Sequence, residues 1–383
     1  MDIFSNFGLW GAGWTGWIIP FLFGLSVVVF FHELGHFLIA RLCGVRVLTF
    51  SVGFGPEIVG FNDRYGTRWK LSWIPLGGYV KFFGDDNAAS VPDEAAVANM
   101  TEAERRQSFF HQPIGRRAAV VAAGPIANFI LAIVIFAVIF AFYGRHTTTA
   151  QVDSVQPDSA AAAAGFRPGD VVVAIDGRAV ESFSDMQRIV IANAGRTLSF
   201  QIDRGGAPMT LTATPALKRG KDGFGNNSCN AVLGVTRSTT DVKTEHVDPL
   251  SAVWLGAKET WSIIDRTFSY IGGLFAGREC ADQLGGPIRI AQISGQVATL
   301  GFMPVLNLVA ALSVSIGLLN LFPIPLLDGG HLLFYAIEAT RGRPLSAKAQ
   351  EIGFRIGFGI VAMLMIFTLV NDTVSLWSRF LGS

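Results

Sequence analysis

Four long apolar stretches constrain this chain more than any other feature of its sequence. They run from about Trp17 to Ala40, Ala118 to Tyr143, Pro304 to Leu327 and Ile356 to Val370. Crossing the roughly 30 Å hydrocarbon core of a bilayer takes about 20 apolar residues in a helix, so each stretch predicts a membrane span. The composition agrees, because 50% of the 383 residues are hydrophobic, only 15% are charged and the mean hydropathy is +0.43.

The same composition excludes several classes of protein. A net charge of +1 gives no basic surface for nucleic acid. Three cysteines are too few for a disulfide scaffold. Residues 1–16 contain no Lys or Arg and no cleavage-site pattern, so we expect no removable signal peptide.

The basic residues near the apolar stretches predict how the chain crosses the membrane. Ten Lys and Arg lie between the first two stretches and four follow the third, whereas residues 1–16 carry none and the tail carries only Arg379. Cytoplasmic loops are enriched in Lys and Arg. We therefore expect both termini and the long segment of residues 144–300 outside, with the two basic loops in the cytoplasm.

Two segments outside the apolar stretches have patterns of their own. Apolar and polar residues alternate over about 48–52 and 68–73 beside glycine-rich turns, which predicts a small sheet with one apolar face. That face could rest on the membrane, or the segment could be an ordinary amphipathic hairpin. Residues 84–108 are polar, acidic and Ala-rich, which is typical of a mobile stretch.

The outer segment contains strand-like runs near 151–155, 171–175, 197–203 and 209–213, with a helical pattern over 184–193. At its centre stands GFRPGDVVVAIDG, in which Pro-Gly-Asp predicts a turn and Asp-Gly a tight hairpin. This order resembles the bacterial PDZ domain, a class that captures peptides by strand addition. From about residue 247 to 300 the chain becomes amphipathic, and we expect helices against the outer membrane surface.

The first apolar stretch contains the sequence His32-Glu33-Leu34-Gly35-His36. In a helix the spacing i, i+4 places both imidazoles on one face, where they can hold one Zn²⁺ with Glu33 beside them as a base for water. Ionisable residues inside a membrane helix are costly and usually mark function. The alternative is a buried polar cluster that ties helices together.

A catalytic zinc usually has three protein ligands, so a third must come from elsewhere in the chain. Asp328 is the best candidate, because it is the only carboxylate of the third stretch and is expected at the same membrane depth as the two histidines. Its alternative role is that of a turn residue before Gly329 and Gly330.

Two more polar residues accompany the third stretch. Asn320 could hydrogen-bond a substrate backbone or a developing oxyanion, or could satisfy carbonyls freed by Pro323 and Pro325. His331 follows Asp328 closely, and we favour a structural or supporting role for it over that of a fourth ligand.

Taken with HELGH, the stretches GFGP, PLGGYVKF, AAGPIANF and LNLFPIPLLDGG make nearly the whole chain resemble a site-2 protease. The resemblance is to the bacterial regulator-of-sigma-E type, an intramembrane zinc metalloprotease. It implies that Glu33 is the general base and that one zinc ion is bound by His32, His36 and Asp328. It also implies that the substrate is contacted by Asn320, Pro323 and Pro325. Several members carry two PDZ domains, and this chain shows one.

The expected fold is a polytopic α-helical membrane protein of about four spans, with a small membrane-associated β region and an inserted α+β PDZ domain. The expected parts are a first span with HELGH (1–45), the β region (46–83), a cytoplasmic loop (84–112), a second span (113–146), the PDZ domain (147–235, core about 150–216), an outer amphipathic segment (236–300), a third span (301–330), and a loop, fourth span and tail (331–383).

The resemblance also implies substrates and a location. The substrates are single-span membrane proteins of the anti-sigma-factor type, and signal-peptide remnants as a second group; the lipid bilayer is a further partner, and nucleic acid is not expected to be one. The location is the bacterial inner membrane, with the PDZ domain on the periplasmic side and the active site nearer the cytoplasmic face. The alternatives are an inactive PDZ-bearing scaffold and a metal transporter. Cys229 and Cys280 share the outer segment and either form a disulfide or stay free.

Overall fold

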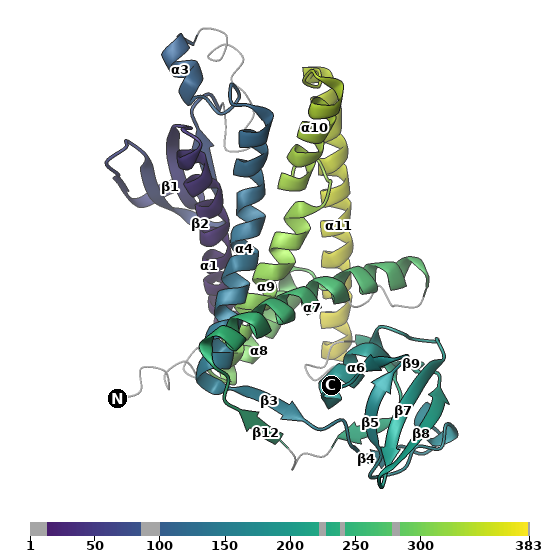
Figure 1. Ribbon diagram of the computed structural model, residues 1–383. Coiled ribbons are helices and arrows are strands. Elements are labelled where there is room, and N and C mark those ends of the chain that lie inside the picture. The colour runs from purple at the N-terminus through teal and green to yellow at the C-terminus, as the bar shows by residue number, and fades with distance from the viewer. Residues whose placement is uncertain (1–13, 86–99, 222–226, 238–241, 278–283, 382–383) are drawn as a thin grey trace, which may run out of the picture. The chain divides into compact units, whose positions relative to one another are not determined.

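The computed structural model describes residues 14–85, 100–221, 227–237, 242–277 and 284–381. The chain forms two compact units, one of residues 1–136 and 287–369 and the other of residues 137–286 and 370–383. Two of the three boundaries between the units fall within long helices, α4 (Ile114–Tyr143) and α11 (Ala347–Leu381), and the third lies between residues 286 and 287. Figure 1 follows the elements along the chain.

Among the described residues, four helices are long and apolar enough to cross a membrane, as expected. The candidate spans are Gly16–Leu42 in α1 (Trp14–Leu42), Ile114–Tyr143 in α4, Phe302–Leu321 in α9 and Lys348–Trp377 in α11. The polytopic helical fold predicted from the sequence is therefore confirmed. The fourth helix is much longer than the stretch of residues 356–370 that suggested it.

The third helix is shorter than the sequence predicted. α9 ends at Leu321, because Phe322 precedes Pro323 and takes an extended conformation with φ −62° and ψ 142°. After an irregular turn in which Leu326 has a φ of +115°, a separate helix, α10 (Asp328–Arg341), begins. Asp328 is thus the first residue of its own helix, and its assignment to the third span is wrong.

The small sheet forms as expected from two long antiparallel strands, β1 (Val47–Asn62) and β2 (Arg68–Phe82). Both strands bend, so residues 47–52 of β1 pair with residues 78–82 of β2 on one side and with residues 68–71 on the other. Residues 57–62 then pair with 68–72. The segment 78–82 therefore forms one edge of the sheet. Its buried face packs on α1 and α4 through Phe37, Phe50, Val80, Phe82 and Val120.

The loop of residues 84–112 is partly helical. A short helix, α3 (Glu102–Gln107), begins with a capping box in which Thr101 and Glu104 satisfy each other's backbone N–H groups. Residues 86–99, which the sequence suggested are mobile, lie outside the described residues.

One helix of the expected outer segment belongs to the first unit instead. α8 (Pro287–Thr299) packs against α1, since a Cβ on Gly295 would lie within 2.9 Å of the Trp17 backbone. Buried Val297 and Ala298 of α8 join Val28 of α1 and Val305 of α9 in one apolar cluster.

The second unit contains the inserted α+β domain. Its main sheet has the order β6 (Arg178–Ala179), β5 (Val171–Ile175), β7 (Leu198–Arg204) and β8 (Ala207–Ala213). Two helices, α5 (Ala160–Ala163) and α6 (Phe183–Ile191), accompany it. The strands and helices follow the order expected of a PDZ domain.

Further short strands surround this sheet. β4 (Val152–Val155) pairs with β11 (Val235–Arg237), β9 (Ala216–Lys221) with β10 (Asn227–Val232), and β3 (Arg145–Thr148) with β12 (Val242–Glu245). Leu233 is 3% exposed and belongs to the same core as Val152, Ile175 and Phe200. The core therefore extends past residue 216, where the sequence placed its end.

An ion pair with a buried carboxylate stabilises this domain. Arg204 Nε donates to Asp170 Oδ1 at 2.7 Å, and Arg204 Nη2 donates to the other carboxylate oxygen at 2.8 Å. The Arg204 guanidinium holds the pKa of Asp170 below its ordinary value. The same unit contains the amphipathic helix α7 (Pro249–Phe275), which Asp248 caps and which exposes Trp254 and Trp261. Cys280 lies outside the described residues, so its pairing with Cys229 stays a prediction.

Candidate metal centre

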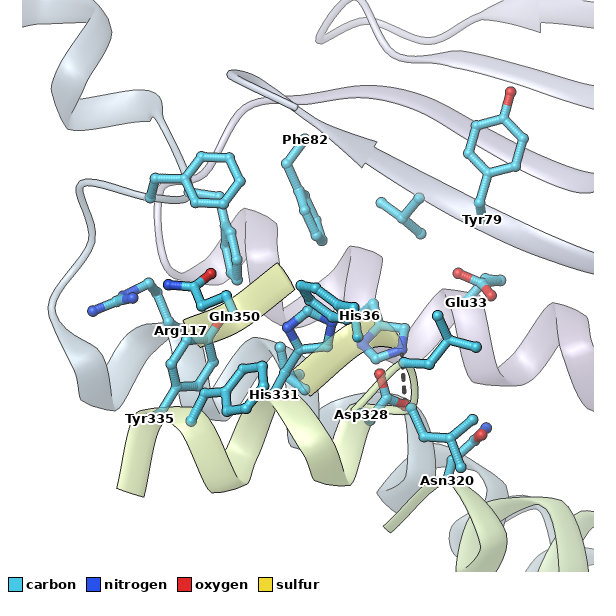
Figure 2. Close-up of a pocket in the computed structure, with 18 of the residues that line it drawn as sticks. Glu33, His36, Tyr79, Phe82, Arg117, Asn320, Asp328, His331, Tyr335 and Gln350 are labelled. Atoms are coloured by element: carbon cyan, nitrogen blue, oxygen red, sulfur yellow. Dashed lines mark ion pairs between the residues drawn. The ribbon is translucent and has the colours of Figure 1, made fainter. Parts of the chain in front are cut away.

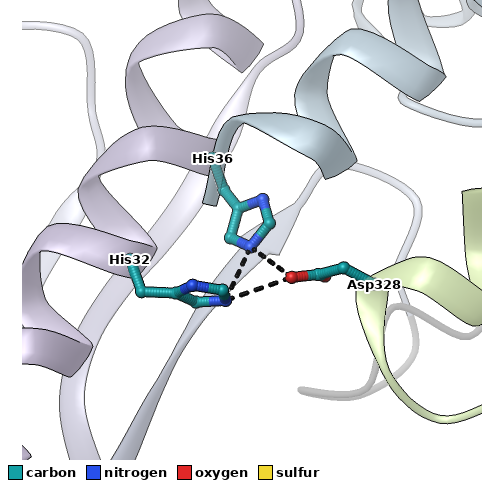
Figure 3. Close-up of side chains that lie close together, drawn as sticks. All are labelled: His32, His36 and Asp328. Atoms are coloured by element: carbon teal, nitrogen blue, oxygen red, sulfur yellow. Dashed lines mark hydrogen bonds and ion pairs between the residues drawn. The ribbon is translucent and has the colours of Figure 1, made fainter. Parts of the chain in front are cut away.

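Helix α1 supplies two imidazoles to one point, as the HELGH spacing predicts. His32 and His36 lie one helical turn apart, and their Nε2 atoms approach each other to 3.2 Å (Figure 3). His32 is 9% exposed, so the pair is largely shielded from solvent. The helix therefore presents two nitrogen ligands in one direction.

Helix α10 brings a carboxylate to the same point. Asp328 Oδ2 lies 3.2 Å from His32 Nε2 and 3.6 Å from His36 Nε2 (Figure 3). The two following glycines allow this position: a Cβ on Gly329 would overlap the carbonyls of Leu321 and Phe322, and one on Gly330 would lie 2.5 Å from Pro325 Cα. The start of α10 can therefore lie directly on the irregular turn before it.

The three side chains have the separations that a tetrahedral zinc requires. Zn–N and Zn–O bonds of about 2.0–2.1 Å place two ligand atoms about 3.3 Å apart, and the observed separations are 3.2, 3.2 and 3.6 Å. Among the described residues no hydrogen-bond donor satisfies the buried Asp328 Oδ2, which faces the two imidazoles instead. His32, His36 and Asp328 therefore fit a cation that shares all three.

Helix α4 fixes the orientation of both imidazoles. His36 Nδ1 donates to the Val120 carbonyl at 2.9 Å, and the Asn128 side-chain amide lies 3.2 Å from His32 Nδ1. The Val120 carbonyl accepts the Nδ1–H of His36, which leaves its Nε2 for a metal. A metal on His32 Nε2 likewise needs an acceptor for Nδ1–H, and the buried Asn128 Oδ1, which has no partner in the described structure, supplies it when the amide is turned by 180°. Asn128 is fully buried. Sequence reasoning missed this residue, although a lone amide in the middle of an apolar 30-residue helix was a signal.

Two glycines let α1 and α4 approach closely beside the site. A Cβ on Gly35 would overlap the Ala123 carbonyl, and a Cβ on Gly124 would lie 2.5 Å from His36 Cε1 and 2.9 Å from His32 Cε1. The backbone of α4 therefore forms the floor on which both imidazoles rest.

Glu33 and Asn320 lie at the same site. Both line a cavity of about 420 Å³ together with His32, His36 and Asp328. Figure 2 shows Glu33 between the Tyr79 segment of β2 and Asp328. Asn320 Nδ2 lies 3.4 Å from His32 Nε2, so the amide reaches the point where the three ligands meet.

The structure separates the remaining candidates from this group. Pro323 and Pro325 do not line the cavity; Pro325 packs against α11, where the missing side chain of Gly357 makes room for its carbonyl. His331 lines the cavity but does not belong to the group of three ligand atoms, and its ring lies 5.6 Å from that of Phe354. Their predicted roles stay predictions.

Aromatic side chains continue the cavity away from the metal ligands. They come from β2, the loop before α4, α10 and α11, and comprise Phe82, Phe109, Phe110, Phe334, Tyr335 and Phe354. Arg117 and Glu338 also line it. The site is thus a polar metal-binding group at one side of a largely apolar chamber.

The site combines an HExxH helix with a third ligand, a carboxylate, inside a bundle of helices that can span a membrane. These features define a class of proteins, the membrane-embedded zinc metalloproteases. Comparison with protein families assigns the chain to one family within it. Residues 20–364 match the model of Peptidase family M50. The chain belongs to this family, its cofactor is zinc and it is a metalloprotease.

Named relatives cover almost the full length of the chain. A protein of Agrobacterium fabrum named "Putative zinc metalloprotease" is 52% identical over 94% of this chain and 97% of its own. The protein named Metalloprotease MmpA, from Caulobacter vibrioides, is 41% identical over 93% of this chain and 94% of its own. Both relatives bear names that agree with the site.

A solved structure is similar to part of the chain. It is the PDZ domain of an SdrC-like protein from Listeria monocytogenes, 22% identical, covering 24% of this chain and 87% of that one with a TM-score of 0.19. The description of the inserted domain rests on its own strands and helices and not on this likeness.

Proposed function

We propose that this metalloprotease hydrolyses peptide bonds in or near the transmembrane segments of single-span membrane proteins. One observation carries the proposal: the metal-binding residues His32 and His36 belong to a helix that is itself apolar enough to cross a membrane. A protease with its ligands at that depth meets substrates that share the membrane.

A transmembrane helix hides its amides in backbone hydrogen bonds, so it must unwind before a peptide bond can be attacked. The segment 78–82 of β2 is an edge of the sheet, and Gly78, Tyr79 and Val80 line the cavity beside Glu33. An edge strand offers unpaired N–H and C=O groups to an extended peptide. We infer that this edge holds the unwound substrate next to the metal ligands.

The side chains around the site have distinct tasks in this reaction. A bound zinc ion supplies Lewis acidity, which polarises a carbonyl and makes water a stronger nucleophile at neutral pH. Glu33 accepts the proton of the attacking water and returns it to the leaving amine. The Asn320 amide donates to the substrate carbonyl oxygen as negative charge develops on it. Asn128 and the Val120 carbonyl keep both imidazoles oriented.

By family resemblance the natural substrates are anti-sigma factors already cut outside the membrane, or remnants of signal peptides. The location proposed is the bacterial inner membrane, with both termini and the PDZ domain outside and the site nearer the cytoplasm. Labelling of Cys43 from outside intact cells would overturn this topology. In this arrangement the PDZ domain admits substrates by size, and removing residues 150–237 would speed cleavage of substrates with large outer domains.

Two variants test the proposal in the purified full-length chain. Glu33→Gln should keep zinc and lose cleavage of a model membrane substrate, because only the base is removed. Asp328→Ala should lose zinc, since two histidines alone do not close a catalytic site. An inactive PDZ-bearing scaffold predicts instead that the wild-type chain cleaves nothing, with or without zinc.

A further inference from the structure

The third metal ligand depends on a helix that the other two do not share. Asp328 begins α10, which is 14 residues long and stands between an irregular turn and Gly342. His32 and His36 are fixed relative to each other by one turn of α1. The metal site is therefore complete only where α10 is held at one position relative to α1 and α4.

A largely buried ion pair joins α10 to α4 away from the metal site. Arg117 Nη2 donates to Glu338 Oε1 at 2.6 Å, and the two side chains are only 13% and 14% exposed. The Arg117 guanidinium also lies over the Tyr335 ring, 4.8 Å from its centre, and its Nε donates to the Gln112 carbonyl at 3.1 Å. The guanidinium is therefore held from three sides. Figure 2 shows Arg117 beside Tyr335, at the other end of the cavity from Asp328.

The ion pair and the metal site share one face of α4. Arg117, Val120, Gly124 and Asn128 follow one another at spacings of three or four residues, which places them in a single stripe of a helix. Val120 and Asn128 orient the imidazoles, and Gly124 supports them. The face of α4 that orients His32 and His36 therefore also binds α10, the helix that carries the third ligand.

The charges of Arg117 and Glu338 do not stabilise the helices that carry them. Arg117 lies in the first turn of α4 and Glu338 in the last turn of α10, where the helix dipoles favour the opposite signs. Local helix stability therefore does not explain the pair, whereas contact between the two helices does.

We propose that the Arg117–Glu338 pair is a clasp that positions Asp328 against His32 and His36 and so sets the zinc affinity of the site. Glu338 lies ten residues beyond Asp328, about 15 Å along α10 at ~1.5 Å per residue. Both are positioning residues, because neither reaches the metal ligands. The inference rests on the zinc site assigned above. It adds the contact that holds the third ligand in place.

The test is zinc affinity of the full-length chain in lipid nanodiscs, measured by competition with a chromogenic chelator. Glu338→Gln and Arg117→Met should each weaken zinc binding roughly tenfold, which is the lower end of the range for loss of a direct partner of a metal ligand, because these residues act through the position of α10. The double variant should be no weaker than either single one, because both break one contact. The exchanged pair R117E/E338R should recover part of the affinity.

A matched control is Glu351→Gln, since Glu351 and Arg355 form an exposed pair of the same 2.6 Å length on α11. It should bind zinc as the wild type does. Cleavage by Glu338→Gln should recover when zinc is raised in proportion to its weaker affinity, which general misfolding would not allow. If Glu338→Gln fails to fold, Glu338→Asp, which keeps the charge on a shorter side chain, should give an intermediate affinity.

Two results would overturn the clasp. The first is wild-type zinc affinity, with an unchanged absorption spectrum of the Co²⁺-loaded site, in Glu338→Gln. The second is a double variant whose loss equals the sum of the single losses. Failure of the wild-type chain to bind zinc would instead contradict the metal site itself.

Discussion

Replacing Gly124 with alanine should damage the metal centre while leaving the fold intact. The added Cβ would overlap His36 Nε2 and would lie 2.5 Å from His36 Cε1 and 2.9 Å from His32 Cε1, where ordinary contact begins at 3.4 Å. The His36 ring would have to move by about 1.1 Å to restore normal contact. It cannot do so freely, because its Nδ1 is bonded to the Val120 carbonyl at 2.9 Å.

A displacement of that size is large for a metal ligand. Metal–ligand distances in working sites vary within about 0.2 Å, and loss of a supporting contact alone costs roughly 10- to 100-fold in metal affinity. We expect about a 100-fold loss for Gly124→Ala, which corresponds to about 3 kcal/mol. Alanine favours a helix over glycine by about 1 kcal/mol, which offsets part of the cost of overpacking. The stability of the zinc-free chain should therefore change little.

The assay compares zinc affinity, zinc-free melting temperature and cleavage in Gly124→Ala and Gly115→Ala. Gly115 lies on the same helix, and no atom of the described structure lies within 4 Å of a Cβ placed there. The control should behave as the wild type. Wild-type zinc affinity in Gly124→Ala would refute this reasoning, because it would mean that the imidazoles can accommodate the added methyl group without leaving the metal.

Two further predictions concern single contacts. Asn128→Leu should weaken zinc binding roughly 10- to 100-fold by removing the partner of His32 Nδ1, whereas Asn128→Asp, which offers an acceptor to the Nδ1–H of a metal-bound His32, should retain most of it. Equal zinc affinities of these two variants in a chelator competition would contradict the role of Asn128. In the inserted domain, the lowered pKa of Asp170 means that its ion pair with Arg204 stabilises the fold above the ordinary Asp range and is lost as the pH falls through the lowered pKa. Protection factors of the β5 and β7 amides in the full chain, which correct for the slower intrinsic exchange at lower pH, should fall on acidification, and Arg204→Met should remove most of that fall; a pH dependence equal to the wild type would argue against the pair.

The sequence predicted those parts of the site that depend on local spacing. Two histidines at i, i+4 must share a helical face, so His32 and His36 could be paired without knowing the fold. Asp328 could be added because basic loops placed it at a similar depth. The separate helix that begins at Asp328 could not be predicted. Pro323 and Pro325 in an apolar run are compatible with a kinked span as well as with a helix that ends and a second one that begins.

Contacts between distant segments were beyond the sequence. Asn128 meets His32 across 96 residues, and nothing in an apolar helix says which neighbour a buried amide will face. Leu233 belongs to the domain core because the three-residue strand β11 pairs with β4, and so short a strand has no readable alternation. In the sequence, Gly124 is one of several small residues in a membrane helix. Only the structure shows that the two imidazoles lie against it.

The distance along the chain between the parts of the site has a consequence during synthesis. His32 and Asn320 are 288 residues apart, and the carboxylate of Asp328 comes later still. Ribosomes add about 5–20 residues per second, so the HELGH helix waits in the membrane for roughly 15 to 60 seconds before its third ligand is made. A nascent chain therefore carries the histidines and the base but no complete metal site. The order of the helices therefore delays the activity until α10 has been made and has brought Asp328 to the two histidines.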